Sequence, residues 1–151
     1  MAIPSHEELK EIVKKLQEIM RIQDWDIELR LCTGQQMLEE TDDVENIGFA
    51  SRNVRHKYAL IRLNAEHPEY AADWYTTLIH ELKHVQTTEF MYVFDKFFCK
   101  IDAPETLKEA FQEQTKDYYE QWMNVCAREF ATLYPVTNFS EGGENSGKEG
   151  S

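Results

Sequence analysis

The segment TLIHELKHV, residues 77–85, contains two histidines four positions apart, with a glutamate directly after the first. Apolar residues recur within the segment at helical spacing, so it predicts an amphipathic helix. In a helix, His80 and His84 lie on one face, one turn apart, and their imidazole rings can converge on one metal ion. The segment therefore predicts a metal site on a helix.

Zinc is the metal that this pattern favours, because zinc binds neutral imidazole and a catalytic zinc site keeps one position open for water. Glu81 follows the first histidine and stands beside the site without binding the ion. There it can take a proton from the attacking water and deliver it to the leaving amine. We therefore predict zinc-dependent hydrolysis of peptide bonds. Such short motifs also arise by chance, and then His80 and His84 are ordinary helix histidines.

A third protein ligand must come from elsewhere in the chain. Because no second histidine motif follows His84, the remaining source is a carboxylate of a later helix. We compared Asp117, Glu120 and Glu129. On a helical wheel Glu120 shares a side with Asn124 and two alanines, which allow another helix to approach closely. Glu129 is a second conceivable ligand, and periodicity alone leaves the two glutamates unresolved.

The motif HELKH, followed by Glu120-Gln-Trp-Met-Asn124, resembles the small gluzincin-type zinc metallopeptidases, including those often encoded by phages. The likeness covers about residues 25–135, and its specific part is the two helices. It implies a zincin-like fold with one zinc ion per chain and Glu120 as the third ligand. It also implies that Asn124 supports a zinc-bound imidazole from outside the ligand set.

Hydrophobic periodicity and turn signals predict an α+β domain over residues 1–135, with about three strands in a small antiparallel sheet. We expect a polar, disordered tail over residues 136–151. The expected elements are a helix over 5–21, a strand over 25–31, a loop over 35–45, a hairpin of strands over 47–53 and 58–64, a helix over 69–90, a loop over 91–103 and a helix over 103–134.

In the resembled families an edge strand holds an extended peptide along the active-site cleft. The hairpin over residues 47–64 is the candidate for this surface here, because it directly precedes the histidine helix. A purely structural explanation is equally good, because a hairpin at this place is also needed to cover the helices. A role in substrate binding is therefore a hypothesis that proline substitution in an outer strand can test.

Composition limits the classes of partner. The formal net charge is −12 and the pI is near 4.8, which argues against nucleic acid as a main partner. No apolar run reaches the length of a membrane span, and the first residues lack the apolar core of a signal peptide. We therefore expect a cytoplasmic protein, in the host cytoplasm if it is phage-encoded, that acts on a peptide or protein substrate.

Several other residues have less specific meanings. Three widely spaced cysteines predict buried free thiols: Cys32, Cys99 and Cys126. Three further histidines are typical of caps and turns: His6, His56 and His67. Three tyrosines can either donate to an oxyanion or pack in the core, and packing is the default: Tyr118, Tyr119 and Tyr134.

Two alternative functions remain open on the sequence. The first is a metal-binding protein of the same fold that cleaves weakly or not at all and serves as a regulatory or interaction module. The absence of an evident oxyanion residue keeps this alternative in place. The second is a helical scaffold without metal, in which the motif is accidental. The oligomeric state is open in all three cases.

Overall fold

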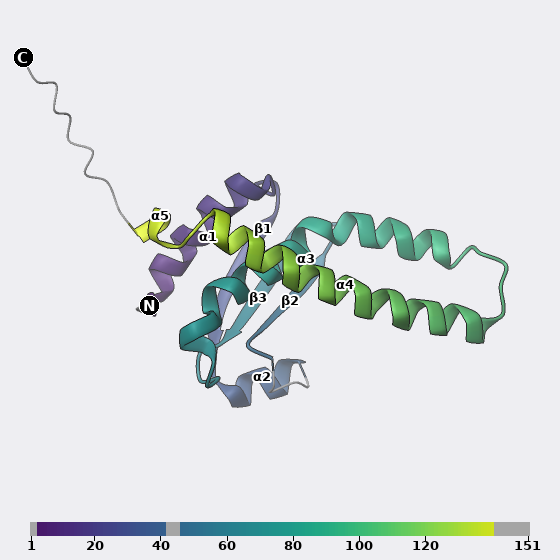
Figure 1. The fold of residues 1–151 in the computed structure, drawn as a ribbon, viewed down its shortest axis with the longest axis horizontal. Helices are drawn as coiled ribbons and strands as arrows, with labels where there is room; N and C mark the ends of the chain where they lie inside the picture. Colours follow the sequence, from purple (N-terminus) through teal and green to yellow (C-terminus); the bar gives the residue numbers. More distant parts are fainter. Residues whose placement is uncertain (1–2, 42–45, 141–151) are drawn as a thin grey trace, which may run out of the picture.

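The computed structural model describes residues 3–41 and 46–140, which form helices that pack against a small sheet (Figure 1). The elements along the chain are α1 (His6–Met20), β1 (Asp26–Cys32), α2 (Gly34–Thr41), β2 (Gly48–Asn53), β3 (Tyr58–Asn64), α3 (Tyr70–Phe98), α4 (Glu105–Leu133) and α5 (Thr137–Ser140). The α+β class predicted from the sequence is confirmed.

The three strands form a mixed sheet in the order β1-β3-β2. β2 and β3 pair antiparallel, as predicted for a hairpin, whereas β1 and β3 pair parallel. The expectation of an antiparallel sheet is therefore wrong for β1. The reason lies in the connection through α2, which carries the chain past the central position to the far edge. The hairpin then returns β3 between the two edge strands, antiparallel to β2 and parallel to β1.

α2 occupies part of the segment that the sequence suggested was a loop. Thr33 Oγ1 accepts a hydrogen bond from Gln36 N, and the Gln36 side chain accepts one from Thr33 N. This reciprocal cap starts a helix, and the fully buried Met37 attaches it to the fold. The loop prediction is thus wrong over residues 35–41, and its remainder, 42–45, lies outside the described residues.

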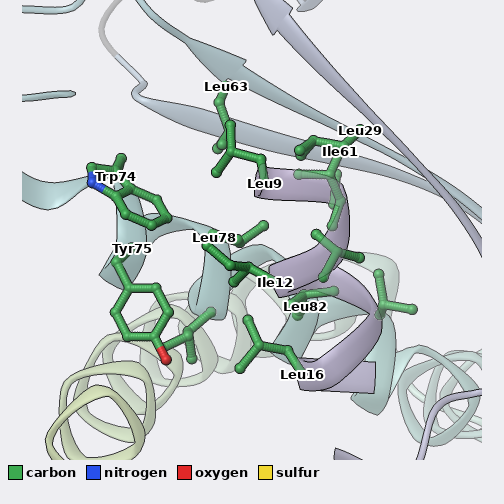
Figure 2. Packing of buried hydrophobic residues seen from close by; sticks show 14 of the residues in the cluster. Leu9, Ile12, Leu16, Leu29, Ile61, Leu63, Trp74, Tyr75, Leu78 and Leu82 are labelled. Atoms are coloured by element: carbon green, nitrogen blue, oxygen red, sulfur yellow. The ribbon is translucent and has the colours of Figure 1, made fainter. Parts of the chain in front are cut away.

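The core lies between the sheet and the two helices that cover one of its faces. Leu9, Ile12 and Leu16 of α1 meet leucines of α3 and the inward side chains of β1 and β3 (Figure 2). Ile61 and Leu63 have no exposed surface, which fits the central position of β3. This packing fixes α3, and with it the histidine motif, against the sheet.

α3 continues eight residues beyond its predicted end at Phe90, so the loop expected over 91–103 is wrong as far as residue 98. Stacked phenylalanines explain the extension. The ring centroids of Phe90 and Phe94 lie 6.5 Å apart, and those of Phe94 and Phe98 lie 6.0 Å apart. Phe98 in turn stacks at 4.8 Å on Phe111 of α4. We call residues 86–119 the helical arm, because α3 and α4 run side by side there and project beyond the sheet (Figure 1).

The ordered fold also extends farther than predicted at its C-terminal end. Val136 is buried, and α5 follows it. The ring of Phe139 lies 6.4 Å from that of Tyr75, and Lys15 Nζ donates to the Phe139 carbonyl. The polar tail therefore does not begin at 136, and residues 141–151 lie outside the described part.

Two further expectations can be compared with the structure. All three cysteines are free, but Cys99 is exposed at the end of α3 rather than buried. Among the described residues, no helix combines the length and apolar character that crossing a bilayer would require.

Candidate metal centre

His80 and His84 lie one turn apart on the face of α3 that is turned toward α4. Their Nε2 atoms are 2.9 Å apart. The rings meet nearly edge to face, with centroids 4.6 Å apart. His84 is buried and His80 is partly buried. The spacing within the helix therefore produces the convergence of imidazole rings that the sequence predicts.

Glu120 reaches this pair from α4. Its Oε2 lies 3.5 Å from His80 Nε2 and 3.4 Å from His84 Nε2. A tetrahedral ion with bonds of about 2.0–2.2 Å separates its ligand atoms by roughly 3.3 Å. The three distances agree with this separation to within about half an ångström, so the cluster could hold one metal ion.

Electrostatics also favour cation binding at this cluster. Hydrogen bonds to His80 and His84 hold the pKa of Glu120 well below its usual range, so the carboxyl group is ionised. Burial opposes protonation of His80, but the hydrogen bond to Glu120 and the charges of Glu81 and Glu120 outweigh it and raise the pKa of His80. The site thus attracts positive charge, here a proton, at the position where an ion would lie.

The structure also distinguishes the acids that the sequence left unresolved. It brings Glu120 to the histidines, whereas Asp117 and Glu129 are exposed and do not belong to the cluster. None of the other histidines joins it either. His6, for example, contacts β1 instead, because its Nε2 lies 2.9 Å from the Leu29 carbonyl oxygen. Whether Glu120 binds a metal stays a prediction.

Glu81 is buried between α3 and β2 and is not one of the three clustered groups. Burial raises its pKa, against the lowering effect of the nearby His80, His84 and Arg52. The absence of a side chain at Gly48 makes room for it. A Cβ built there would lie 2.6 Å from Thr77 Cγ2 and 3.1 Å from Glu81 Oε1.

The orientation of His84 is fixed by groups that sequence reasoning did not assign to it. The Tyr119 hydroxyl lies 3.3 Å from His84 Nδ1 and also contacts Thr87 Oγ1. Arg52 Nη1, from β2, donates to the His84 carbonyl oxygen at 3.3 Å. Tyr119 directly precedes Glu120, so one turn of α4 supplies both the carboxylate and the partner of the imidazole.

Asn124 lies on α4 one turn after Glu120 and borders the same cavity as His80. It lies close enough to favour the protonated form of His80. His80 Nδ1 is nevertheless buried without a well-formed hydrogen bond among the described residues. The supporting role predicted for Asn124 therefore stays a prediction.

Two cavities flank the histidines. One, of about 370 Å³, is bordered by His80, Glu81 and the start of β2, together with charged residues such as Asp73 and Arg128. The other, of about 460 Å³, is bordered by His84, Glu120 and apolar side chains of the helical arm. The cluster therefore has space on both sides along the interface of α3 and α4.

β2 is an edge strand of the sheet, and its first residue, Gly48, borders the first cavity. Asn64 N donates to the Ile47 carbonyl at 2.7 Å, so Ile47 directs its main chain toward β3. Because this direction alternates along an antiparallel strand, Gly48, Ala50 and Arg52 direct their N–H and C=O groups away from β3. The first of these residues adjoins Glu81.

Comparison with known proteins gave no match, whether against protein families, curated sequences or solved structures. A functional assignment for this chain consequently rests on the geometry of its own residues.

Proposed function

We propose that this chain is a zinc-dependent peptidase of the gluzincin type, in which His80, His84 and Glu120 hold the metal and Glu81 is the general base. The observation that carries the proposal is the triangle of donor atoms from α3 and α4, at 2.9, 3.4 and 3.5 Å. Two imidazoles and one carboxylate form a catalytic zinc donor set that leaves a position for water.

The motif itself favours zinc over other metals. The same donor set also binds iron in some enzymes, so the ligands alone do not select the ion. Histidines at i and i+4 on one helix, with a glutamate directly after the first, are the arrangement that zinc peptidases use. A zinc ion at this site would acidify a water molecule and polarise the carbonyl of the substrate.

Glu81 supplies the proton transfers in this proposal. Its carboxyl group borders the same cavity as His80, in a buried setting that raises its pKa. A base with such a pKa accepts the proton of the attacking water and still releases it to the leaving amine. The backbone of Gly48 lies directly against this carboxyl group, since a Cβ there would come within 3.1 Å of Glu81 Oε1.

The outward edge of β2 supports an extended peptide as the substrate. Gly48, Ala50 and Arg52 direct their main-chain groups away from β3, which suits the addition of a peptide as a further strand. Gly48 borders the first cavity and Arg52 the second. The cavities on both sides of the histidines leave room for chain on each side of a scissile bond. The substrate of the proposal is therefore a peptide or unfolded protein segment.

Elemental analysis together with a peptide-library assay tests the proposal. We expect about one zinc per chain in the wild type, lost in His84→Ala and Glu120→Ala. Glu129→Ala is the matched control, because it removes the same charge from an exposed position of α4 and should keep the metal. Glu81→Gln should keep zinc and lose cleavage.

Four outcomes would overturn parts of the proposal. Absence of zinc after it has been supplied would make the motif accidental, and iron in its place would remove the peptidase assignment. Zinc retained in Glu120→Ala but lost in Glu129→Ala would move the third ligand. Zinc without cleavage of any library peptide would favour the metal-binding module without peptidase activity.

A further inference from the structure

The outer face of the helical arm, with its continuation on α4 as far as Val125, carries two rows of exposed apolar side chains. Within each row the residues follow one another mainly at spacings of three and four, the pattern of helices that pack on other helices. Their side chains are between 46% and 69% exposed. The rows consist of Phe90, Val93 and Phe97 on α3 and Leu107, Phe111, Tyr118, Trp122 and Val125 on α4.

The two rows form one surface, which we call the arm stripe. Phe90 of α3 and Tyr118 and Trp122 of α4 border a single groove of about 410 Å³. Thr87 and Tyr119 also line this groove, and almost all of its surface is apolar. Tyr92 lies about 200° around α3 from Phe90, at a turn of 100° per residue, and is therefore outside the stripe.

The stripe is too large for an ordinary surface patch. With 150–250 Å² for each aromatic side chain and the exposed fractions above, the five aromatic residues alone present roughly 450–750 Å². Val93, Leu107 and Val125 add to this area. The largest apolar patch of a typical monomer is about 300–600 Å², whereas a stable interface buries about 800 Å² per partner. The area thus matches one half of a stable protein interface.

We propose that the arm stripe is the interface of a symmetric homodimer, in which the arms of two copies pair as a four-helix bundle. A two-fold axis buries both rows at once, because each copy contributes the same two-helix surface.

Sedimentation velocity of the untagged full chain tests this inference. We expect the wild type to sediment as a dimer of the 17.8 kDa chain at micromolar concentration. Phe97→Glu and Trp122→Glu, one on each arm helix, should be monomeric. Both side chains are more than half exposed, so the far-UV circular dichroism should stay that of the wild type. Tyr92→Glu is the matched control, since it adds the same charge to the opposite face, and it should remain dimeric.

Three results would overturn the inference. They are a wild type that is monomeric throughout the concentration range, a dimer that persists in both stripe variants, and equal dissociation in Tyr92→Glu. Because none of these measurements involves metal or cleavage, they are independent of the proposed peptidase function.

Discussion

At the scale of single residues, Gly48 shows how closely β2 approaches the candidate site. The distance of 2.6 Å from a Cβ at this position to Thr77 Cγ2 is shorter than real Cβ contacts. Any side chain would therefore displace the strand or the helix. The glycine is required here for close approach rather than for an unusual backbone angle.

Gly48→Ala should destabilise the protein by about 1–3 kcal/mol, the usual cost of overpacking a close contact. If Glu81 acts as proposed, cleavage should also fall, while the zinc content should stay constant because no ligand is touched. Denaturant unfolding measures the first effect. Gly34→Ala is the control, since its Cβ would meet nothing closer than 3.8 Å. Equal stabilities of the two variants would contradict the crowding seen at Gly48.

Tyr119 is the residue that connects the imidazole of His84 to α4. Tyr119→Phe keeps the ring and removes the hydroxyl that lies 3.3 Å from His84 Nδ1. We expect zinc affinity to fall roughly 10–100-fold, as is usual when a group that orients a histidine ligand is lost. Competition with a chromophoric chelator measures this. Tyr118→Phe, at the exposed neighbouring position, should bind like the wild type, and an unchanged affinity in Tyr119→Phe would exclude the orienting role.

The sequence identified the residues of the site that lie close together along the chain. His80, Glu81 and His84 follow from one turn of helix. The choice between Glu120 and Glu129 did not follow, because both lie on one helix whose rotation depends on tertiary packing. Gly48 gave no signal, and Tyr119 was considered only for packing or for donation to an oxyanion. The contacts of both residues depend on distances between segments far apart in sequence.

At the scale of elements, the strand β2 determines what can enter the first cavity. Its outward main-chain groups adjoin Glu81, and only one of its edges is paired in the sheet. Proline is tolerated at an edge position whose N–H does not belong to the ladder. Ala50 is such a position, so proline there removes an outward donor and leaves the pairing with β3 intact.

Ala50→Pro should lower kcat/KM for a library peptide at least about tenfold if the peptide adds to β2 as a strand. Zinc content should not change. Ile27→Pro, at an outward position of the opposite edge strand, is the control and should leave cleavage unaffected. Full cleavage by folded Ala50→Pro would exclude β2 as the substrate edge.

The elements themselves were predicted unevenly from sequence. Strong periodicity located α1, the hairpin and the two long helices. The parallel pairing of β1 was missed because strand order depends on the path of the chain and not on any one strand. The extension of α3 to Phe98 was missed because the segment after Phe90, rich in phenylalanine, was interpreted as a loop. In the structure these phenylalanines stack on one another and on α4.

At the scale of the whole molecule, the candidate ligands join two helices that are connected only through the far end of the arm. A metal bound to the folded state alone stabilises it by about 2.7 kcal/mol at a hundredfold excess over Kd. For a domain of this size that corresponds to roughly 5–10 °C in Tm. The fold class could be predicted from hydrophobic periodicity and turn signals, but the protruding shape could not.

Scanning fluorimetry with zinc and with chelator should therefore show a Tm difference of this order. Glu120→Ala should abolish the difference, and Glu129→Ala should retain it. The same shift in both variants would mean that the stabilising metal binds elsewhere.

The helical arm extends from the candidate metal cluster, so a small tilt of α3 at the cluster is amplified at the far end of the arm. From His84 to Phe98 the helix rises about 21 Å, so one degree of tilt at the cluster moves the tip by about 0.4 Å. Metal–ligand distances are fixed to within about 0.2 Å, which leaves little freedom for tilt. We therefore expect an ion held near the sheet to set the direction and stiffness of residues that lie far from it.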